Sequence, residues 1–303
     1  MTGATGFLGG EIVRQAIAAG VATRALTRRF GLLPEGVEAA VGDVRNPESL
    51  GSAMGEMSWV IHAAGLAHGR EEGAGSVEAT NVGGTENVVR AAAAAGACRV
   101  VLVSSVSVYG GSAGRVLDEG SPCHPDAAYA ASKHAAELVA TELSKLVGVD
   151  LLILRLATLY GEGDPGNLAR LIRAIDGGRF VLPGSGKNRK SLLHREDAAR
   201  ACLDAARACS ATGIYNVVGS VARIEEVVEI IARRLGRRAL RAPVPEGVIS
   251  AVSRLNAFDR VRALFRDDAY DGSRFEATFG FRPRVPLEEG LEREIEWYRR
   301  RRP

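Results

Sequence analysis

The first ten residues, MTGATGFLGG (1–10), place Gly3, Gly6 and Gly9 at three-residue intervals. Residues 11–19 (EIVRQAIAA) continue with apolar side chains at helical spacing, which predicts a glycine-rich turn that opens a helix. Main-chain N–H groups at such a helix start bind anions, and the missing Cβ atoms let a diphosphate approach closely. The alternative is a tight strand-to-helix turn that binds no ligand.

Composition limits the classes of protein that this chain can belong to. Its 303 residues, 46% of them hydrophobic, suffice for one main core with a smaller satellite domain. Because no long apolar run and no signal peptide is found, we expect a cytoplasmic protein with no membrane partner. The four cysteines and five histidines show no CxxC, HxxxH or HxH pattern, so no metal site is predicted. A net charge of +3 on scattered arginines argues against nucleic acid.

Strands and helices alternate along the first half of the chain. Apolar β-like runs at 21–27, 58–64, 99–103 and 150–156 are separated by helical patterns that include 77–95 and 126–145. This alternation is typical of βαβ units and predicts an α/β fold with a doubly wound parallel sheet. Ligands bind such sheets at the carboxyl ends of the strands, so the residues just past each strand are the candidate site.

Three of these strand ends favour a nucleotide. About twenty residues past the glycine turn, where an NAD-binding fold carries an acid, stand Arg28 and Arg29, which favour the 2′-phosphate of NADP. Their alternative is a solvated charge pair in a loop. Asp43 could accept a hydrogen bond from an adenine amino group, or could be an ordinary surface aspartate. The small residues 63–65 (AAG) would let a cofactor lie against the sheet.

A tyrosine and a lysine indicate acid–base chemistry. Tyr129 and Lys133, in YAASK, are four residues apart and therefore share one face of the helix predicted at 126–145. An ammonium beside a phenol lowers the pKa of the phenol toward working pH. Ser105, at the end of the preceding strand, could bind a substrate oxygen. The alternative is an amphipathic surface helix with a snorkelling lysine.

With these motifs in order, the chain resembles the extended short-chain dehydrogenases/reductases of the nucleotide-sugar epimerase/dehydratase family. The match runs nearly end to end, over TGATGFLG (2–9), GDV (42–44), VIHAAG (60–65), NVGGTENV (81–88), SSVSVYG (104–110), YAASK (129–133), LRLATLYGEGD (154–164), KSLLHREDAARA (190–201) and YNVVG (215–219). The resemblance implies a Rossmann-type domain at 1–160, joined by 188–220, and a smaller C-terminal α/β domain for the substrate at 161–187 and 221–303. It also implies a homodimer.

The resemblance assigns roles to individual residues. It implies that Ser105, Tyr129 and Lys133 form a catalytic trio, with Tyr129 moving a proton while nicotinamide exchanges a hydride at the same sugar carbon. NADP is preferred and NAD is possible. The implied cofactor-binding residues are Gly3, Thr5, Gly6, Phe7, Leu8, Gly9, Arg28, Arg29, Asp43, Val44, Ala63, Ala64, Gly65, Tyr129, Lys133 and Leu156.

The implied substrate is a nucleotide-linked hexose. Its sugar and diphosphate would contact Ser105, Thr158, Asn167, Leu168, Arg189, Lys190 and Arg262. Lysine at position 190 stands where the family generally has arginine, and it binds phosphate as a point charge without the bidentate geometry.

One departure from the family narrows the reaction. Similar 4,6-dehydratases carry an acidic Asp–Glu pair directly after the strand-end serine or threonine, in order to eliminate water. Val106 and Ser107 stand there in this chain. We therefore expect epimerisation or ketoreduction, at carbon 4 of the sugar, and no dehydration.

Two other functions stay open. A steroid- or flavonoid-type alcohol dehydrogenase of the same superfamily would have an apolar substrate cleft that the basic 187–190 loop does not face. A cofactor-binding protein without turnover would keep the fold, although such proteins tend to lose the tyrosine or the lysine.

The start of the chain leaves a structural question. Only Met1 and Thr2 precede Gly3, whereas the family has a full strand there, at the centre of the sheet. We expect a truncated first strand in a natural protein that begins several residues earlier. The centre of the sheet should then show either a gap or a substitute strand.

Overall fold

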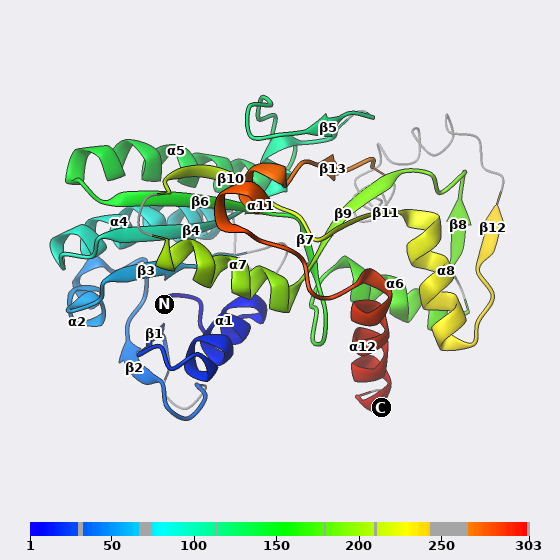
Figure 1. Ribbon diagram of the computed structural model, residues 1–303, viewed down its shortest axis with the longest axis horizontal. Coiled ribbons are helices and arrows are strands. Elements are labelled where there is room, and N and C mark those ends of the chain that lie inside the picture. The colour runs from blue at the N-terminus through cyan, green and yellow to red at the C-terminus, as the bar shows by residue number, and fades with distance from the viewer. Residues whose placement is uncertain are drawn as a thin grey trace.

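The fold is built on one parallel sheet, whose strands follow one another from top to bottom in Figure 1. The computed structural model describes residues 1–29, 33–66, 74–112, 114–178, 180–208, 211–242 and 266–301. The sheet runs in the order β2, β1, Thr2, β3, β4, β6, β10, and all neighbours pair in parallel. Its strands are β1 (Arg24–Thr27), β2 (Glu38–Val41), β3 (Trp59–His62), β4 (Arg99–Ser105), β6 (Asp150–Leu156) and β10 (Gly213–Val217).

The first strand is reduced to the residues before Gly3. Thr2 forms a parallel bridge to Leu26 on one side and to His62 on the other, so it occupies the central position itself. Its N–H donates to Ile61 O at 3.0 Å, and Leu26 N–H donates to Met1 O at 2.8 Å. The expectation of a gap or a substitute strand at the centre of the sheet is therefore wrong, because Thr2 itself pairs with both neighbouring strands.

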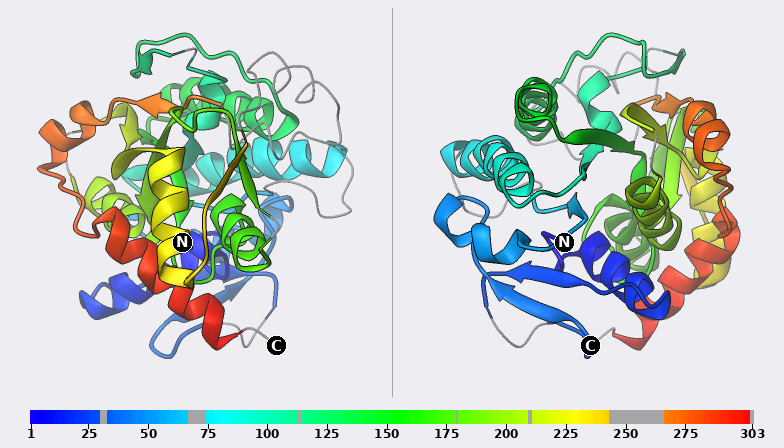
Figure 2. Two further views of the ribbon diagram at one scale, coloured as in Figure 1. Left: turned by 90° about the vertical axis from the view of Figure 1, so that its right-hand side faces the viewer. Right: turned by 60° about the vertical axis from the view of Figure 1, so that its left-hand side comes forward.

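Helices cover both faces of the sheet because the strand residues alternate between two cores. Val100 and Leu102 pack with α4 (Gly84–Ala94) and α5 (Ala128–Val147), whereas Val101 packs with α1 (Phe7–Ala18) and α7 (Arg195–Arg207). The right-hand view of Figure 2 shows these two pairs of helices on opposite sides of the sheet. The doubly wound arrangement predicted from the sequence is therefore confirmed.

Short elements connect these layers. Asn46 caps η1 (Pro47–Ser49) by accepting a hydrogen bond from Glu48 N–H. The other connecting elements are α2 (Gly51–Met54), α3 (Ala74–Glu78), the π-helix η2 (Ala79–Gly83), η3 (Val106–Tyr109) and β5 (Val116–Leu117).

A second core lies beyond the carboxyl end of the main sheet. It is formed by apolar faces of α6 (Asn167–Asp176), α8 (Ile224–Leu235) and α12 (Leu287–Arg300), which Figure 1 shows grouped together. Around them lie β7 (Thr158–Tyr160), β8 (Val181–Pro183), β9 (Arg189–His194), β11 (Ser220–Arg223) and β12 (Leu240–Ala242). The sheet order β11, β9, β7 puts residues from the 188–220 segment beside this second core.

Part of the C-terminal segment packs on the main core, which differs from the predicted division. β13 (Ala269–Tyr270) pairs with β5, and α11 (Ser273–Phe279) lies against β10. Phe275 and Phe281 are buried in the same core cluster as Tyr215 of β10. Their rings contact one another, with centroids 5.2 Å apart. These aromatic residues therefore belong to the main core by packing, although the sequence assigned all of 221–303 to the substrate domain.

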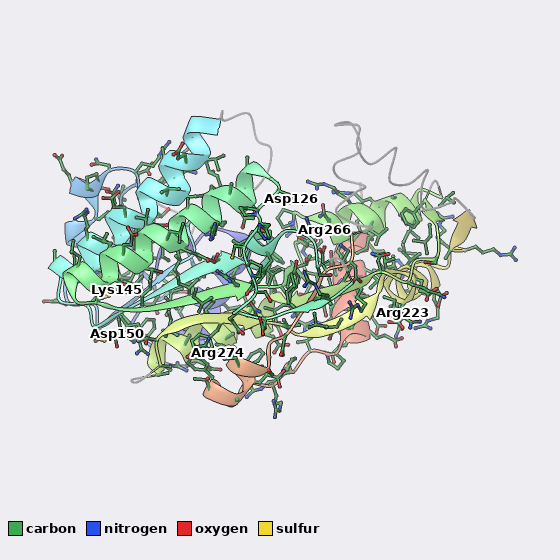
Figure 3. All side chains as sticks on the ribbon, turned by 90° about the horizontal axis from the view of Figure 1, so that it is seen from above. Asp126, Lys145, Asp150, Arg223, Arg266 and Arg274 are labelled. Carbon is green, nitrogen blue, oxygen red and sulfur yellow. The ribbon has the colours of Figure 1, made fainter. Side chains whose placement is uncertain are left out.

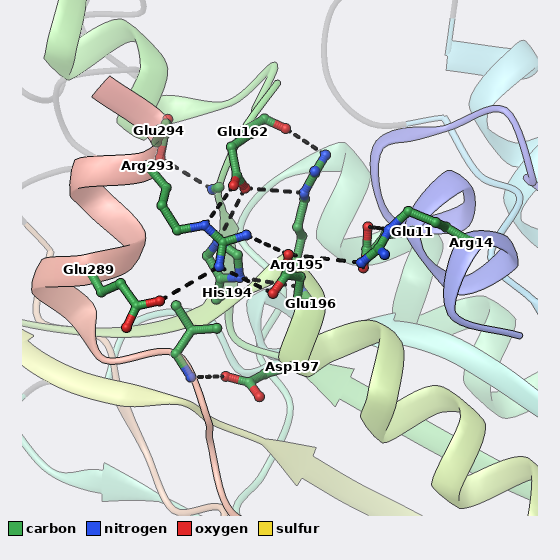
Figure 4. A network of polar contacts seen from close by, with 12 residues as sticks. Glu11, Arg14, Glu162, His194, Arg195, Glu196, Asp197, Glu289, Arg293 and Glu294 are labelled. Carbon is green, nitrogen blue, oxygen red and sulfur yellow. Dashed lines mark hydrogen bonds and ion pairs between the residues drawn. The ribbon is translucent and has the colours of Figure 1, made fainter. Parts of the chain in front are cut away.

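An ionic network joins the two halves (Figure 4). Arg293 of α12 donates to Glu162 at 2.7 Å and also pairs with Glu196 of α7. Burial raises the pKa of Glu162, but the contact of His194 Nε2 at 3.4 Å, followed by the hydrogen bond and charge of Arg293, outweighs burial and lowers the pKa to about 2. Glu162 lies in the loop that leads into α6, so the network fixes that loop against α12.

Glu294 is the buried acid beside this network. Only 1% of it is exposed, and its Oε2 accepts a hydrogen bond from Gly161 N–H at 3.2 Å. Within the described ranges, its Oε1 has no hydrogen-bond partner. Burial, followed by the negative charge of Asp164, raises the pKa of Glu294 to about 9. The side chain is therefore a neutral carboxylic acid at pH 7.

We predict that Glu294→Gln stabilises the protein increasingly as pH rises. The folded protein holds a proton on Glu294 that the unfolded chain releases above its ordinary pKa. The free energy of unfolding of the wild type therefore falls as pH rises from that ordinary pKa to about 9, by at most about 1.4 kcal/mol per pH unit. Thermal unfolding should show little difference at pH 5 and a midpoint several degrees higher for the variant at pH 8.

Glu296→Gln is the matched control on the same helix. That carboxylate is 53% exposed and pairs with Arg300, so its removal should leave the pH dependence unchanged. If the unfolding midpoints of wild type and Glu294→Gln change with pH in parallel, the assignment of a neutral Glu294 is contradicted.

Candidate functional site

The glycine turn forms the entrance to α1. Gly3 has a φ of +72°, and a Cβ at this residue would lie 2.6 Å from Ala64 N. A Cβ at Gly9 would lie 2.0 Å from Gly3 O. Gly6 is the N-cap of α1 and provides no side-chain hydrogen bond to the first turn. The turn thus needs glycine at two positions, and it leaves the first N–H groups of α1 directed at the carboxyl edge of the sheet.

The other residues of the turn divide by exposure. Thr5 is exposed and Phe7 is half-buried, with the Arg195 guanidinium 5.8 Å from the ring centroid. Leu8 is 7% exposed and its side chain packs in the main core. Leu8 could therefore contact a cofactor through its main chain only.

The end of β3 lies against this turn and against α5. Ala64 N–H donates to Thr2 Oγ1 at 3.2 Å. A Cβ at Gly65 would lie 3.2 Å from Asn81 Oδ1 and 3.9 Å from Lys133 Nζ. The structure therefore brings Gly3, Ala63, Ala64, Gly65 and Lys133 together, at the point where the strand order reverses and dinucleotides bind in such sheets.

At the end of β1, the predicted phosphate contacts are exposed. Arg28 and Arg29 both lie at the surface, and Thr27 Oγ1 donates to Arg29 O at 2.8 Å. Asp43 differs from its predicted role, because Arg45 binds its carboxylate with Nε at 3.1 Å and Nη2 at 2.7 Å. The hydrogen bonds from Arg45, with a smaller effect of the Arg28 charge, lower the pKa of Asp43. Asp43 is thus the partner of a cation that the sequence analysis did not include.

Two apolar residues predicted to contact the cofactor are core residues. Val44 is 6% exposed and packs on the α4 side of the sheet. Leu156 is 3% exposed and packs on the α1 side. Both side chains are therefore held in the protein core.

Ser105 and Tyr129 lie on neighbouring elements. Ser105 ends β4, at the same level as Leu156 of β6, and its Oγ accepts a hydrogen bond from Ser107 N–H at 3.1 Å. Tyr129 and Lys133 lie in α5, which packs against β4 and η3. The three predicted catalytic residues thus come from adjacent elements at one edge of the sheet.

Asn81 links these elements and was not among the predicted site residues. It is 1% exposed and lies in the π-helix η2. Its Oδ1 accepts from Leu66 N–H at 2.8 Å, and its Nδ2 donates to Ser132 Oγ at 2.9 Å. Ser132 in turn donates to Tyr129 O at 2.8 Å. The signal in the sequence was its place within the motif NVGGTENV, whereas its burial and the π-helical turn are visible only in the structure.

The acid–base properties of the site are set mainly by burial. Burial raises the pKa of Tyr129 to about 12, so the predicted lowering by Lys133 is not what the structure shows. Burial also lowers the pKa of Lys133 to about 8, against the opposing charge of Glu137. His62, which hydrogen-bonds Thr2 Oγ1 at 2.7 Å and Thr85 Oγ1 at 3.1 Å, has a pKa lowered by burial to about 3. Tyr129 is therefore a phenol, and His62 a neutral structural residue, at pH 7.

The predicted substrate residues of the second half are only partly accessible. Thr158 is exposed in β7, and Asn167 is exposed at the start of α6, where its Oδ1 accepts from Arg170 at 3.0 Å. Leu168 is 4% exposed and packs in the second core, so its side chain does not face a ligand. Arg262 lies outside the described residues.

The basic residues predicted to bind the diphosphate are already paired with aspartates. Arg189 binds Asp267 at 2.7 Å, and Lys190 binds Asp268 at 2.6 Å. Arg266 contacts both Asp268 and Asp126, each at 2.7 Å, and extends toward α5 (Figure 3). Lys190 is 7% exposed, which contradicts its role as a free phosphate ligand. This pairing could not be predicted from the sequence, because the partners of Arg189 and Lys190 follow 78 positions later.

Neither long apolar helices nor metal clusters are found in the described ranges. There, no helix is long and apolar enough to cross a membrane. The same residues contain no group of three or more His, Cys, Asp or Glu side chains that could hold a metal ion.

The chain belongs to the NAD dependent epimerase/dehydratase family, whose sequence pattern matches residues 1–218. A dTDP-glucose 4,6-dehydratase of an Actinoplanes species is 28% identical over 325 residues, covering 100% of this chain and 98% of that protein. An Escherichia coli enzyme named N-acetyl-alpha-D-glucosaminyl-diphospho-ditrans,octacis-undecaprenol 4-epimerase is 31% identical over 196 residues, covering 64% of this chain and 58% of its own.

A solved structure extends the likeness to three dimensions. MoeE5 in complex with UDP-glucose and NAD is 29% identical, with a TM-score of 0.81 over 99% of this chain and 97% of that chain. The predicted family and the Rossmann-type α/β fold are confirmed. The relatives are named both as 4-epimerases and as 4,6-dehydratases, so their names leave the specific reaction undetermined.

We predict that Gly9→Ala impairs nucleotide binding at the turn whereas Gly10→Ala does not. The added Cβ at Gly9 would overlap Gly3 O, and so would force the turn out of its conformation. At Gly10 the Cβ would lie 3.6 Å from Ala4 O, an ordinary contact, and alanine would favour the helix by about 0.5–1 kcal/mol. Calorimetric titration with NAD and NADPH should show at least tenfold weaker binding for Gly9→Ala. Equal affinities in the two variants would argue against the turn as the diphosphate site.

Proposed function

We propose that this protein is an NAD(P)-dependent epimerase or ketoreductase that acts at carbon 4 of a nucleotide-linked hexose. The observation that carries the proposal is the position of Lys133 Nζ, 3.9 Å from a Cβ built at Gly65 and one turn from Tyr129. A proton-transfer pair thus borders the edge where the glycine turn opens. The likeness to MoeE5, which was solved in complex with UDP-glucose and NAD, supports both the cofactor class and the substrate class.

The proposed roles follow from the chemistry of each side chain. A bound nicotinamide would exchange a hydride with the sugar carbon. Tyr129, protonated at pH 7, would give its proton to the oxygen that forms during reduction, and would take it back in the reverse direction. Ser105 Oγ would hold the same oxygen by a hydrogen bond. Lys133 would donate to the cofactor's ribose and stabilise the deprotonated phenol.

Dehydration is excluded from the proposal by the residues that follow Ser105. Val106 is 5% exposed and packs in the main core, and Ser107 has no titratable group. Removal of water from a sugar needs a base for a carbon-bound proton and an acid for the leaving hydroxyl. Positions 106 and 107 provide neither, although several relatives are named as dehydratases.

The diphosphate is assigned to Arg189 alone among the basic residues of 187–190. Its side chain is 33% exposed even though it is paired with Asp267, so it could bind a second anion. Lys190 is assigned a structural role with Asp268.

The predicted homodimer stays a prediction. Leu138 and Leu146 are exposed on α5, which is consistent with a partner on that face. A cytoplasmic location also stays a prediction.

We predict that Tyr129→Phe abolishes hydride exchange and leaves cofactor binding within about twofold. The phenyl ring preserves the packing of α5 but cannot transfer a proton. Single-turnover absorbance of the reduced nicotinamide, with UDP-, dTDP- and GDP-hexoses as substrates, measures the first property, and fluorescence titration measures the second. Full activity in the variant would refute the role of Tyr129.

We predict tighter binding of NADPH than of NADH, with the preference lost in Arg28→Ala. Arg28 is exposed and its charge reaches Asp43, which places it beside the predicted adenosine end of the site. Guanidinium groups bind phosphate bidentately, so the 2′-phosphate should gain about tenfold in affinity. Arg14→Ala, which removes an exposed arginine in α1 that pairs with Glu11, is the control. Equal affinities of wild type for the two nucleotides would overturn the NADP preference.

A further inference from the structure

A buried ion pair lies behind the candidate catalytic residues. Glu137 of α5 and Arg155 of β6 are 2% and 4% exposed. Arg155 Nη2 donates to Glu137 Oε2 at 2.6 Å, and its Nε donates to Oε1 at 3.0 Å. Ser104 Oγ donates to the same carboxylate at 2.5 Å. Three donors from two strands thus fix one carboxylate.

The position of the pair in the chain relates it to the site. Glu137 follows Lys133 by four residues, so both lie on one face of α5. Ser104 directly precedes Ser105 at the end of β4. The Glu137 carboxylate therefore ties the helix that carries Tyr129 and Lys133 to the strand that carries Ser105.

The Glu137 carboxylate also affects the protonation of Lys133. Of the groups that face Lys133, His62 from β3 is neutral and Tyr129 from α5 is a phenol, whereas Glu137 is negative. Burial lowers the pKa of Lys133, and the charge of Glu137 opposes that effect. Arg155 is paired with Glu137, and burial raises the pKa of the Cys123 thiol, which also senses the charges of both residues. Glu137 is thus the group that favours the ammonium form of Lys133.

We propose that Glu137 is a positioning residue for the redox reaction: fixed by Arg155 and Ser104, it ties the helix that carries Lys133 to the strand that carries Ser105 and favours the ammonium form of Lys133. The inference rests on the proposed function, since it gives Glu137 a role only through Lys133. Stability alone does not account for the ion pair, because a buried ion pair can often be replaced by apolar side chains without loss of folding stability. A carboxylate that supports a buried ammonium has no apolar substitute.

The test is the pH dependence of cofactor binding, followed by fluorescence titration with NADPH and NADH. In wild type, affinity should decline above about pH 8, as Lys133 loses its proton. In Glu137→Gln the decline should begin about one pH unit lower, so that the two proteins nearly match at pH 6, differ about fivefold at pH 8 and approach a tenfold difference at higher pH. Glu137→Asp, which keeps the charge, should restore much of the wild-type profile. The pH profile of hydride exchange should shift in the same direction.

The matched control is Asp197→Asn. Asp197 is also 2% exposed and pairs with an arginine, Arg200, at 2.7 Å. Its carboxylate differs in accepting hydrogen bonds from the main-chain N–H groups of Arg284 and Val285. Its loss should lower stability without moving the pH profile. If Glu137→Gln does not fold, the double variant Glu137→Gln, Arg155→Met removes both charges and should still show the shift.

The outcomes separate the inference from the proposed function. Suppose that Lys133→Met removes the alkaline decline in cofactor affinity, whereas Glu137→Gln and the double variant keep the wild-type pH profile. This result would overturn the role of Glu137 alone. No alkaline decline in wild type would refute the proposed contact between Lys133 and the cofactor, and the inference with it. A shift in Glu137→Gln and in the double variant, absent in Asp197→Asn, would support it.

Discussion

The approach of the glycine turn to the end of β3 is the contact on which the candidate site depends. Gly3 lies so close to Ala63 and Ala64 that any Cβ there would overlap the main chain. This contact sets the start of α1 at the carboxyl edge of the sheet, beside the strand end that leads to Gly65. Because Thr2 alone pairs with both β1 and β3, the turn is also fixed directly to the centre of the sheet.

The remaining parts of the site are positioned by register and by buried polar contacts. Parallel pairing sets Ser105 of β4 level with Leu156 of β6, and α5 then crosses above this edge. Asn81 joins the strand end at Leu66 to Ser132 of the same helix, and Glu137 joins that helix to Ser104. The candidate acid–base residues are thus held by hydrogen bonds on both sides, which limits the movement of the groups that would transfer a proton.

Local patterns in the sequence were sufficient for the sheet, the helices and the strand-end residues, because these depend on periodicity and on turn chemistry. Partners that lie far away in the chain could not be predicted in this way. Asp267 and Asp268 neutralise Arg189 and Lys190, and only the fold brings them together. The pKa of Tyr129 was predicted in the wrong direction, since spacing on a helix reveals the neighbouring charge but not the burial that outweighs it. Likewise Asp43, read by itself, gave no indication that Arg45 binds it.

The central claim is hydride exchange at one sugar carbon without loss of water. Its most direct test is mass spectrometry and NMR of the products formed from UDP-, dTDP- and GDP-hexoses in deuterium oxide, with NAD or NADPH supplied. The account predicts a product that retains every carbon-bound oxygen and carries no solvent deuterium at carbon 5. This product is either the epimer at carbon 4 or the sugar in which the alcohol and the ketone at carbon 4 have been interconverted. A product lighter by one water that carries deuterium at carbon 5 would contradict the account.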